Sequence, residues 1–165
     1  MRRFFIQEIP DEEHPRCVLD STESHHLFRV VKIAKGEEVI LFDGKGHSCV
    51  AILDKTLIQR AELCWIRDLH EERDDTEIWL YLCLLKQQAW STSLRMATEL
   101  GVHHIVPVVA DRSIVRKEKK DRWESIILSS TKQCGRAHLP QLHSFCSFSD
   151  MCSSSFSYPR YILAP

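Results

Sequence analysis

The chain has 165 residues, of which 44% are hydrophobic and 27% charged, and its formal net charge at pH 7 is −1. This composition is typical of a soluble globular protein and argues against a disordered chain. No apolar run approaches the roughly 20 residues that a membrane-spanning helix requires, and the apolar run after Met1, Arg2 and Arg3 is too short for a signal peptide.

The first 70 residues predict a small β-rich unit. A helix is expected from Asp20 or Ser21 to Ile33, because Asp20 can cap it and Glu23 follows three residues later. A turn at residues 43–46, Asp-Gly-Lys-Gly, joins two strands into a hairpin. The expected strands cover residues 3–6, 17–19, 38–42, 47–54 and 60–69. Several short strands within 70 residues favour a small barrel.

An acidic stretch at residues 71–77 is interpreted as a linker, and the hydrophobic pattern changes beyond it. A continuous apolar run at 78–85 predicts a strand that is covered on both faces. A helix at 90–100, with Leu94, Ala97 and Leu100 on one face, is expected to end at Gly101. The remaining predictions are strands at 105–109, 140–145 and 161–164 and a helix at 119–134. Alternating strands and helices indicate an α/β unit with a parallel sheet.

The seven cysteines are odd in number and none forms a C-x-x-C pair. This pattern supports neither a disulfide framework nor a zinc site, and free thiols suit the reducing cytoplasm, where we expect the protein to act. Cys134 lacks an activating base nearby in the sequence and is interpreted as a buried thiol. The pairs His25 and His26, and His103 and His104, are interpreted as capping or core residues.

The segment from Arg112 to Arg136 contains eight basic and three acidic residues. Such a stretch is either a solvated helix face or an anion site. In parallel α/β sheets, ligands bind at the carboxyl ends of the strands. The loop after Val109, with Asp111, Arg112 and Ser113, is therefore a candidate site, and so is Lys86, which directly follows a predicted strand.

Several motifs occur in an order that resembles the RsmE family, a group of methyltransferases of the SPOUT superfamily that methylate N3 of a uridine in small-subunit (16S) rRNA. The motifs are HHLFRVVKIAKGEEVILFDGKG, LLK, MATELGVHHIVP, DRS, RW and KQCGR. The resemblance covers the whole chain. It implies a PUA-like RNA-binding barrel at 1–70, a linker at 71–77 and the first part of a SPOUT α/β-knot domain at 78–165.

The resemblance also implies S-adenosylmethionine as the methyl donor, small-subunit rRNA or a ribosomal particle as a partner, and a homodimer. No membrane or metal partner is expected. The basic residues expected to contact RNA are Arg2, Arg3, Arg29, Lys32, Lys86, Arg112 and Arg136. Mechanistically, an arginine near the uracil oxygens would stabilise the negative charge on the deprotonated base.

The chain departs from the family pattern at several positions. Met96 stands where the family usually has a lysine, and Lys32 stands where it usually has an arginine, which alone offers a planar donor fork. The family continues beyond Leu163, Ala164 and Pro165 with glycine-rich cofactor loops, so these three residues match the start of the first loop. We therefore expect an incomplete knot and weigh a second hypothesis, a catalytically inactive, truncated RNA-binding remnant of the family.

Overall fold

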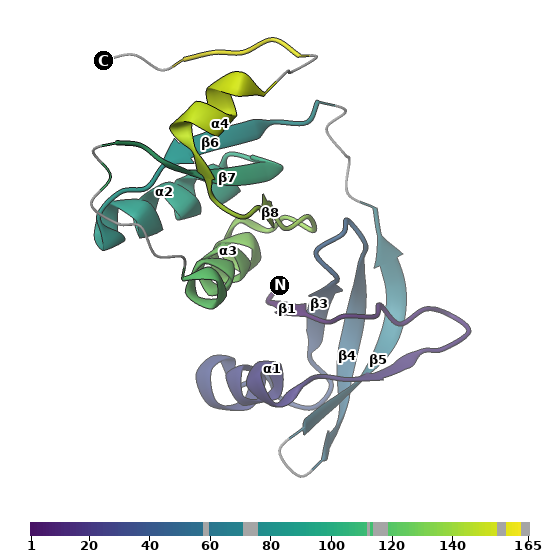
Figure 1. Cartoon of the computed structure of the whole chain (residues 1–165). Coiled ribbons are helices and arrows are strands. Elements are labelled where there is room, and N and C mark those ends of the chain that lie inside the picture. The colour runs from purple at the N-terminus through teal and green to yellow at the C-terminus, as the bar shows by residue number, and fades with distance from the viewer. Residues whose placement is uncertain (58–59, 71–75, 112, 114–118, 155–157, 163–165) are drawn as a thin grey trace.

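In the computed structural model, the protein folds as two sheet-based units that lie against each other (Figure 1). The structure describes residues 1–57, 60–70, 76–111, 113, 119–154 and 158–162. We call the part before residue 71 the N-terminal unit and the part from residue 76 onward the C-terminal unit. The mixed α/β class that the sequence predicts is confirmed.

The N-terminal unit is a five-stranded sheet in the order β1-β3-β4-β5-β2. β1 pairs with β3 in parallel, whereas the other neighbours are antiparallel. Register shifts in β4 bend the sheet, because a bulge increases local twist. The sheet curls around a core to which every strand contributes a buried or half-buried side chain. The strands are β1 (Arg3–Phe5), β2 (Arg16–Val18), β3 (Glu38–Phe42), β4 (Ser48–Leu57) and β5 (Arg60–Leu69).

A short helical segment packs on this sheet. The Asp20 carboxylate caps α1 (Ser21–His25) by accepting a hydrogen bond of 2.7 Å from the Glu23 backbone N–H. The helix continues as η1 (His26–Val31), a π-helical turn that ends at Lys32 in the left-handed conformation, with φ of 60°. The predicted helix thus exists, but its second half is wider than an α-helix. Its buried residues, such as Leu27, join the core of the sheet.

The C-terminal unit is a parallel four-stranded sheet in which the long strand β7 is central. Figure 1 shows α2 and α3 on one side of this sheet and α4 on the other. Leu80 and Ile105 face the two long helices and share a core with Trp90, Leu94 and Trp123. The strands are β6 (Trp79–Cys83), β7 (His104–Val109), β8 (Gln141–Leu142) and β9 (Cys146–Ser147), and the helices are α2 (Gln87–Glu99), α3 (Lys120–Cys134) and α4 (Phe148–Ser153).

Five details of the sequence-based expectation are wrong. The strand expected at 140–145 is replaced by the separate short strands β8 and β9, and α4 was not predicted. Tyr161 and Ile162 are not in a strand. Leu100 is 77% exposed, because it is the C-cap of α2 and lies off the buried face that Trp90, Leu94 and Ala97 form. The Cys134 thiol is exposed, because it lies on the outer side of the last turn of α3.

The two units meet where the turn between β3 and β4 contacts the segment after α3. The backbone N–H of Leu139 donates to the Gly44 carbonyl at 2.8 Å, and the N–H of Gly46 donates to the Ala137 carbonyl at 3.2 Å. A Cβ on Gly46 would lie 2.3 Å from the His138 ring. This junction therefore depends on glycine at a position of positive φ that also allows a close approach.

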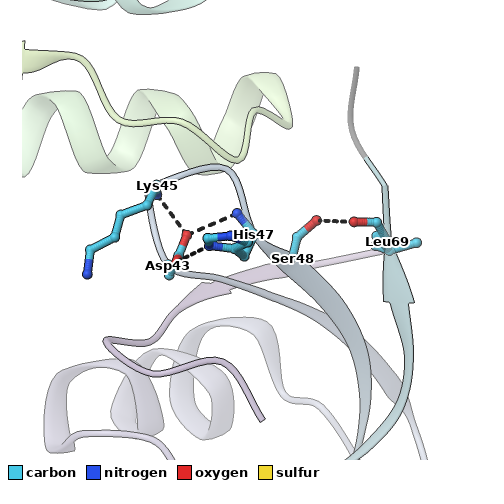
Figure 2. Close-up of polar contacts among 5 residues, drawn as sticks. All are labelled: Asp43, Lys45, His47, Ser48 and Leu69. Atoms are coloured by element: carbon cyan, nitrogen blue, oxygen red, sulfur yellow. Dashed lines mark hydrogen bonds and ion pairs between the residues drawn. The ribbon is translucent and has the colours of Figure 1, made fainter. Parts of the chain in front are cut away.

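The Asp43 carboxylate holds this turn in shape (Figure 2). It accepts hydrogen bonds from the backbone N–H groups of Lys45, at 2.7 Å, and of His47, at 3.1 Å, and it contacts Nδ1 of His47 at 2.8 Å. Burial alone would raise the pKa of Asp43, but the hydrogen bonds from His47 and from the two backbone groups outweigh burial and lower it. The ionised carboxylate is thus the form that supports the junction.

Candidate functional site

The carboxyl edge of the parallel sheet gathers the starts of the two long helices. β6 ends at Cys83 and β7 at Val109, and because these strands run in parallel, both ends lie at the same edge. Lys86 is exposed at the N-cap of α2, so the structure places this predicted site residue at that edge. Lys119 has the corresponding position at the N-cap of α3.

Neither helix start has a side-chain cap. The first turn of α2 has no acidic residue, and the first turn of α3 has Asp121 alone. The first backbone N–H groups of an α-helix have no partner within the helix, and they carry the positive end of the helix dipole. The carboxyl edge therefore presents N–H donors beside lysine side chains.

A cavity of about 90 Å³ lies between these two helix starts. Trp90 and Trp123 form part of its wall, with ring centroids 5.1 Å apart at an angle of 53°. Gln87 and Arg122 line it as well, and in the amide orientation that satisfies both groups the Gln87 oxygen accepts from Nη2 of Arg122 at 2.8 Å. The cavity thus combines an aromatic wall with a positioned guanidinium.

A second basic surface lies on the N-terminal unit. Arg29 and Lys32 are both exposed, with exposed Val30 between them, on the π-helical turn η1 and its left-handed end. π-Helical turns are rare and often mark functional sites. A left-handed lysine is also uncommon. This local geometry presents two cations at the surface.

Arg3 and Arg136, also predicted site residues, lie beside helix ends. A Cβ on Gly135, the C-cap of α3, would be 3.7 Å from Nη1 of Arg3, and a Cβ on Gly101, just after α2, would be 2.4 Å from Nη1 of Arg136. Arg3 also stacks on Phe42, with Cζ 5.6 Å from the ring centroid. Cations are favourable near helix C-termini, so both guanidinium groups have a structural role available. Arg2 is exposed beside β1.

Some predicted residues cannot be placed. Arg112 and the expected cofactor contacts Leu163, Ala164 and Pro165 lie outside the described residues. Ser113, next to Arg112, closes a turn at the carboxyl edge, because its Oγ accepts from the Ala110 backbone N–H at 3.0 Å.

Histidines gather at the opposite edge of the parallel sheet. His104 stacks on Trp79, with ring centroids 3.9 Å apart, and its Nδ1 lies 3.1 Å from Nε2 of His143. Burial, and then the nearby His104, lower the pKa of His143, which favours the neutral ring. Among the residues that the structure describes, no group of three His, Cys, Asp or Glu side chains is arranged to hold a metal ion.

Sequence reasoning missed three structurally important side chains. Glu23 was treated only as a helix-capping residue, but it is buried and pairs with Lys132 of the other unit. Asp43 was predicted as a turn residue, but its hydrogen bonds to Lys45 and His47 were not predicted. Trp90 was not singled out at all. The Asp-Gly-Lys-Gly pattern predicted the turn and could also have suggested the hydrogen bonds of Asp43 to backbone N–H groups, whereas contacts between distant segments give no local signal.

Comparison with known proteins connects both units to one enzyme class. Residues 72–165 match a family model described as an RNA methyltransferase domain, and residues 19–59 match one described as an RNA methyltransferase PUA domain. Within the described part of the chain, no helix is long and apolar enough to cross a membrane.

Curated and solved relatives agree with these matches. Ribosomal RNA small subunit methyltransferase E of Bacillus subtilis is 24% identical over 99% of this chain, which spans 68% of that relative. The enzyme of the same name from Aquifex aeolicus is 32% identical over 72% of this chain, and the match covers 53% of the Aquifex enzyme. A crystal structure of the Neisseria gonorrhoeae enzyme, bound to S-adenosyl methionine, is similar over 95% of this chain and 67% of its own length, with a TM-score of 0.86 and 26% identity.

Proposed function

The chain belongs to the RsmE family of RNA methyltransferases, and we propose that it serves the methylation of N3 of a uridine in 16S rRNA, with S-adenosylmethionine as methyl donor. The observation that supports this best is the similarity over 95% of the chain to a relative solved with that cofactor. A substrate in rRNA means that the protein would act in the cytoplasm, where ribosomes are assembled.

The cavity between the starts of α2 and α3 is too small to enclose the whole cofactor. It measures about 90 Å³, whereas pockets for ligands of this size usually enclose roughly 300 Å³ or more. A larger cavity of about 570 Å³ lies in the N-terminal unit, between β1 and β2, away from the parallel sheet. We therefore assign no step of methyl transfer to the described residues.

The proposed share of these residues is to bind and orient the RNA. The proposed contacts are Arg2, Arg3, Arg29, Lys32, Lys86, Arg112 and Arg136, because Arg and Lys provide most contacts to phosphate oxygens. Of these, Arg29, Lys32 and Lys86 are the exposed residues whose positions most directly support the proposal. Arg3 and Arg136 would combine an RNA contact with their places beside helix ends.

The small size of the cavity favours a second candidate function, RNA binding without catalysis by this chain. The two candidates make different predictions for the cofactor. If the chain only binds RNA, isothermal titration should detect no micromolar binding of S-adenosylmethionine, and incubation with unmodified small ribosomal subunits should yield no N3-methyluridine by mass spectrometry.

The second candidate predicts this outcome together with retained binding of small-subunit rRNA. Formation of N3-methyluridine would mean that these 165 residues suffice for catalysis. A chain that binds neither RNA nor cofactor would overturn both candidates.

We also propose that two copies of the chain associate. Trp79, Phe145 and Phe148 of the C-terminal unit are large apolar side chains that remain exposed, and apolar side chains are enriched at the centres of homodimer interfaces. Sedimentation equilibrium should show a dimer, and a monomer at all concentrations would remove this part of the proposal.

A further inference from the structure

Two histidine side chains from different strands meet at the amino edge of the parallel sheet. His104 begins β7 and His143 follows β8, and Nδ1 of His104 lies 3.1 Å from Nε2 of His143, within hydrogen-bond distance. A neutral imidazole has one N–H donor and one acceptor nitrogen, whereas a protonated imidazole has two donors and no acceptor. The hydrogen bond therefore forms only while at least one of the two rings is neutral.

The His104 ring is held in place on its other sides. It stacks on the Trp79 indole, with ring centroids 3.9 Å apart and an angle of 14° between the rings. Its Nε2 lies 3.6 Å from a carboxylate oxygen of Glu77. The neighbouring His103 is occupied elsewhere, because its Nδ1 accepts from the Ile78 backbone N–H at 3.1 Å. Repulsion between two protonated rings would therefore displace His143 and not His104.

His143 belongs to the segment that follows α3. The backbone N–H groups of Gln141 and His143 donate to carbonyls at the amino end of β7, at 2.8 Å and 2.9 Å. Two residues before Gln141, the N–H of Leu139 donates to the Gly44 carbonyl of the N-terminal unit. The segment from residue 139 to residue 143 thus contacts the other unit at one end and β7 at the other.

We infer that the contact between His104 and His143 is a pH-sensitive latch that fixes this segment on β7. The latch is closed while one ring is neutral. When both rings carry a proton, two N–H donors face each other, and the segment is released from β7. Release would also loosen the contact of Leu139 with the N-terminal unit, so the junction between the units would respond to pH.

The pKa of His143 gives the direction of the response. Burial, and then the nearby His104, lower this pKa, so in the closed latch His143 stays neutral below the pH of about 6.5 at which a free imidazole takes up its proton. In the open latch, His143 is exposed and regains its ordinary pKa. Below about pH 6.5 the open state therefore binds more protons, and acid favours opening. Between pH 8 and pH 7 the latch should stay closed.

Hydrogen exchange of single backbone N–H groups in the whole chain measures this opening. The protection factors of Leu139, Gln141 and His143, each corrected for the intrinsic pH dependence of exchange, are compared at pH 7.5 and pH 5.5. They should fall several-fold at pH 5.5, by up to about tenfold, because the two states differ by one proton over one pH unit. Leu84 is the internal control, because its N–H donates to the Val108 carbonyl at the other edge of the same sheet, and its protection should stay unchanged.

Two variants test whether the histidine pair causes the response. In His143→Gln, the side-chain amide can donate to or accept from Nδ1 of His104 but takes up no proton, so the protection of Gln141 should be similar at both pH values. His14→Gln removes a histidine whose side chain is 83% exposed in the N-terminal unit. This matched control should respond to pH as the wild type does.

A second measurement needs no variant. Long-range ¹H–¹⁵N spectra of the wild type follow the protonation of the His143 ring, which should take up its proton over the same acidic range in which Gln141 loses protection. Protonation of His143 without a loss of protection at Gln141 would overturn the latch.

The remaining outcomes are equally decisive. An equal loss of protection at Leu84 would mean that acid unfolds the whole sheet, and an equal response of wild type and His143→Gln would mean that another group titrates. Either result would overturn the latch. Unchanged protection of Leu139 alone would overturn the link to the junction. The latch rests on contacts within the chain, so it stands or falls independently of the proposed function.

Discussion

At the scale of single residues, the ion pair between Glu23 and Lys132 joins the two units. These residues are 109 positions apart in sequence, and their side chains are 6% and 15% exposed. The Glu23 carboxylate also accepts from the Phe5 backbone N–H at 3.3 Å. A buried charge without its partner is costly, because the low-dielectric surroundings solvate it poorly.

Lys132→Met should therefore destabilise the protein strongly. The expected loss in the free energy of unfolding is about 3 kcal/mol, because Glu23 stays buried without a counter-charge. Urea denaturation of the variant measures this loss. The double variant Glu23→Gln with Lys132→Met should recover much of the stability.

The exposed pair of Lys120 and Glu124 provides the control for this prediction. Their nitrogen and oxygen are 3.9 Å apart, and their side chains are more than half exposed. Lys120→Met should cost less than about 1 kcal/mol, since surface pairs contribute little. Equal losses for Lys120→Met and Lys132→Met would contradict the role given to the buried pair.

The lowered pKa of Asp43 predicts a pH dependence. A carboxylate whose pKa is lower in the folded state stabilises the protein above its unfolded pKa of about 3.9, and this contribution is lost as the pH falls through the folded pKa. Asp43→Asn should therefore be less stable than the wild type at pH 7, and the difference should shrink below about pH 4. Denaturation curves at both pH values test this, and a constant difference would be inconsistent with the hydrogen-bond network of Asp43.

At the scale of elements, the turn between β3 and β4 requires glycine for reasons of space as well as conformation. Gly46 has a φ of 109° and faces the His138 ring, whereas Gly36 has a φ of 88° and no atom within 4 Å of the position that a Cβ would take. Gly46→Ala should thus cost clearly more stability than Gly36→Ala. The second variant reports only the backbone strain of a positive φ, roughly 1 kcal/mol.

The difference between these two alanine variants measures the contact between the units. In a His138→Ala background, Gly46→Ala should cost about as much as Gly36→Ala, because the ring that blocks the Cβ is gone. A difference that persists in this background would mean that the cost arises within the turn and not at the junction.

Much of the element order could be predicted from the sequence. The continuous apolar run around Leu80 and Leu82 predicted a strand, and the helical spacing of Trp123 and Ile127 predicted a helix, because a helix buried on one side repeats its apolar residues with the helical period. α4 is signalled only by its capping box at Ser147 and Asp150, and the π-helical turn has no periodic signature of its own. The observed ends of helices and strands differ from the predicted ends where packing against another element determines them.

The candidate site was predictable only in part. Lys86 follows a strand in a parallel sheet, so general rules for α/β folds were enough to single it out. The contact between the rings of Trp90 and Trp123 and the pairing of Glu23 with Lys132 depend on segments that are distant in sequence. A single sequence without homologues carries no signal for such contacts.

At the scale of the whole molecule, the junction fixes two basic surfaces relative to each other. The turn at Gly44 and Gly46 and the pair of Glu23 and Lys132 both join the units. The π-helical turn with Arg29 and Lys32 belongs to one unit, and the carboxyl edge with Lys86 belongs to the other. The proposed RNA would therefore contact surfaces on both units of a single, preorganised body, which reduces the ordering cost of binding.

The most direct test of the proposed RNA recognition is the affinity for a fragment of unmodified small-subunit rRNA, compared with a large-subunit fragment of equal length, across salt concentrations. We predict tighter binding of the small-subunit fragment. We also predict a salt slope that falls by roughly one to two units in Arg29→Gln with Lys32→Gln, but little in the equally charged control Lys35→Gln with Lys55→Gln. Equal affinity for the two fragments, or equal slopes for the two double variants, would contradict the account.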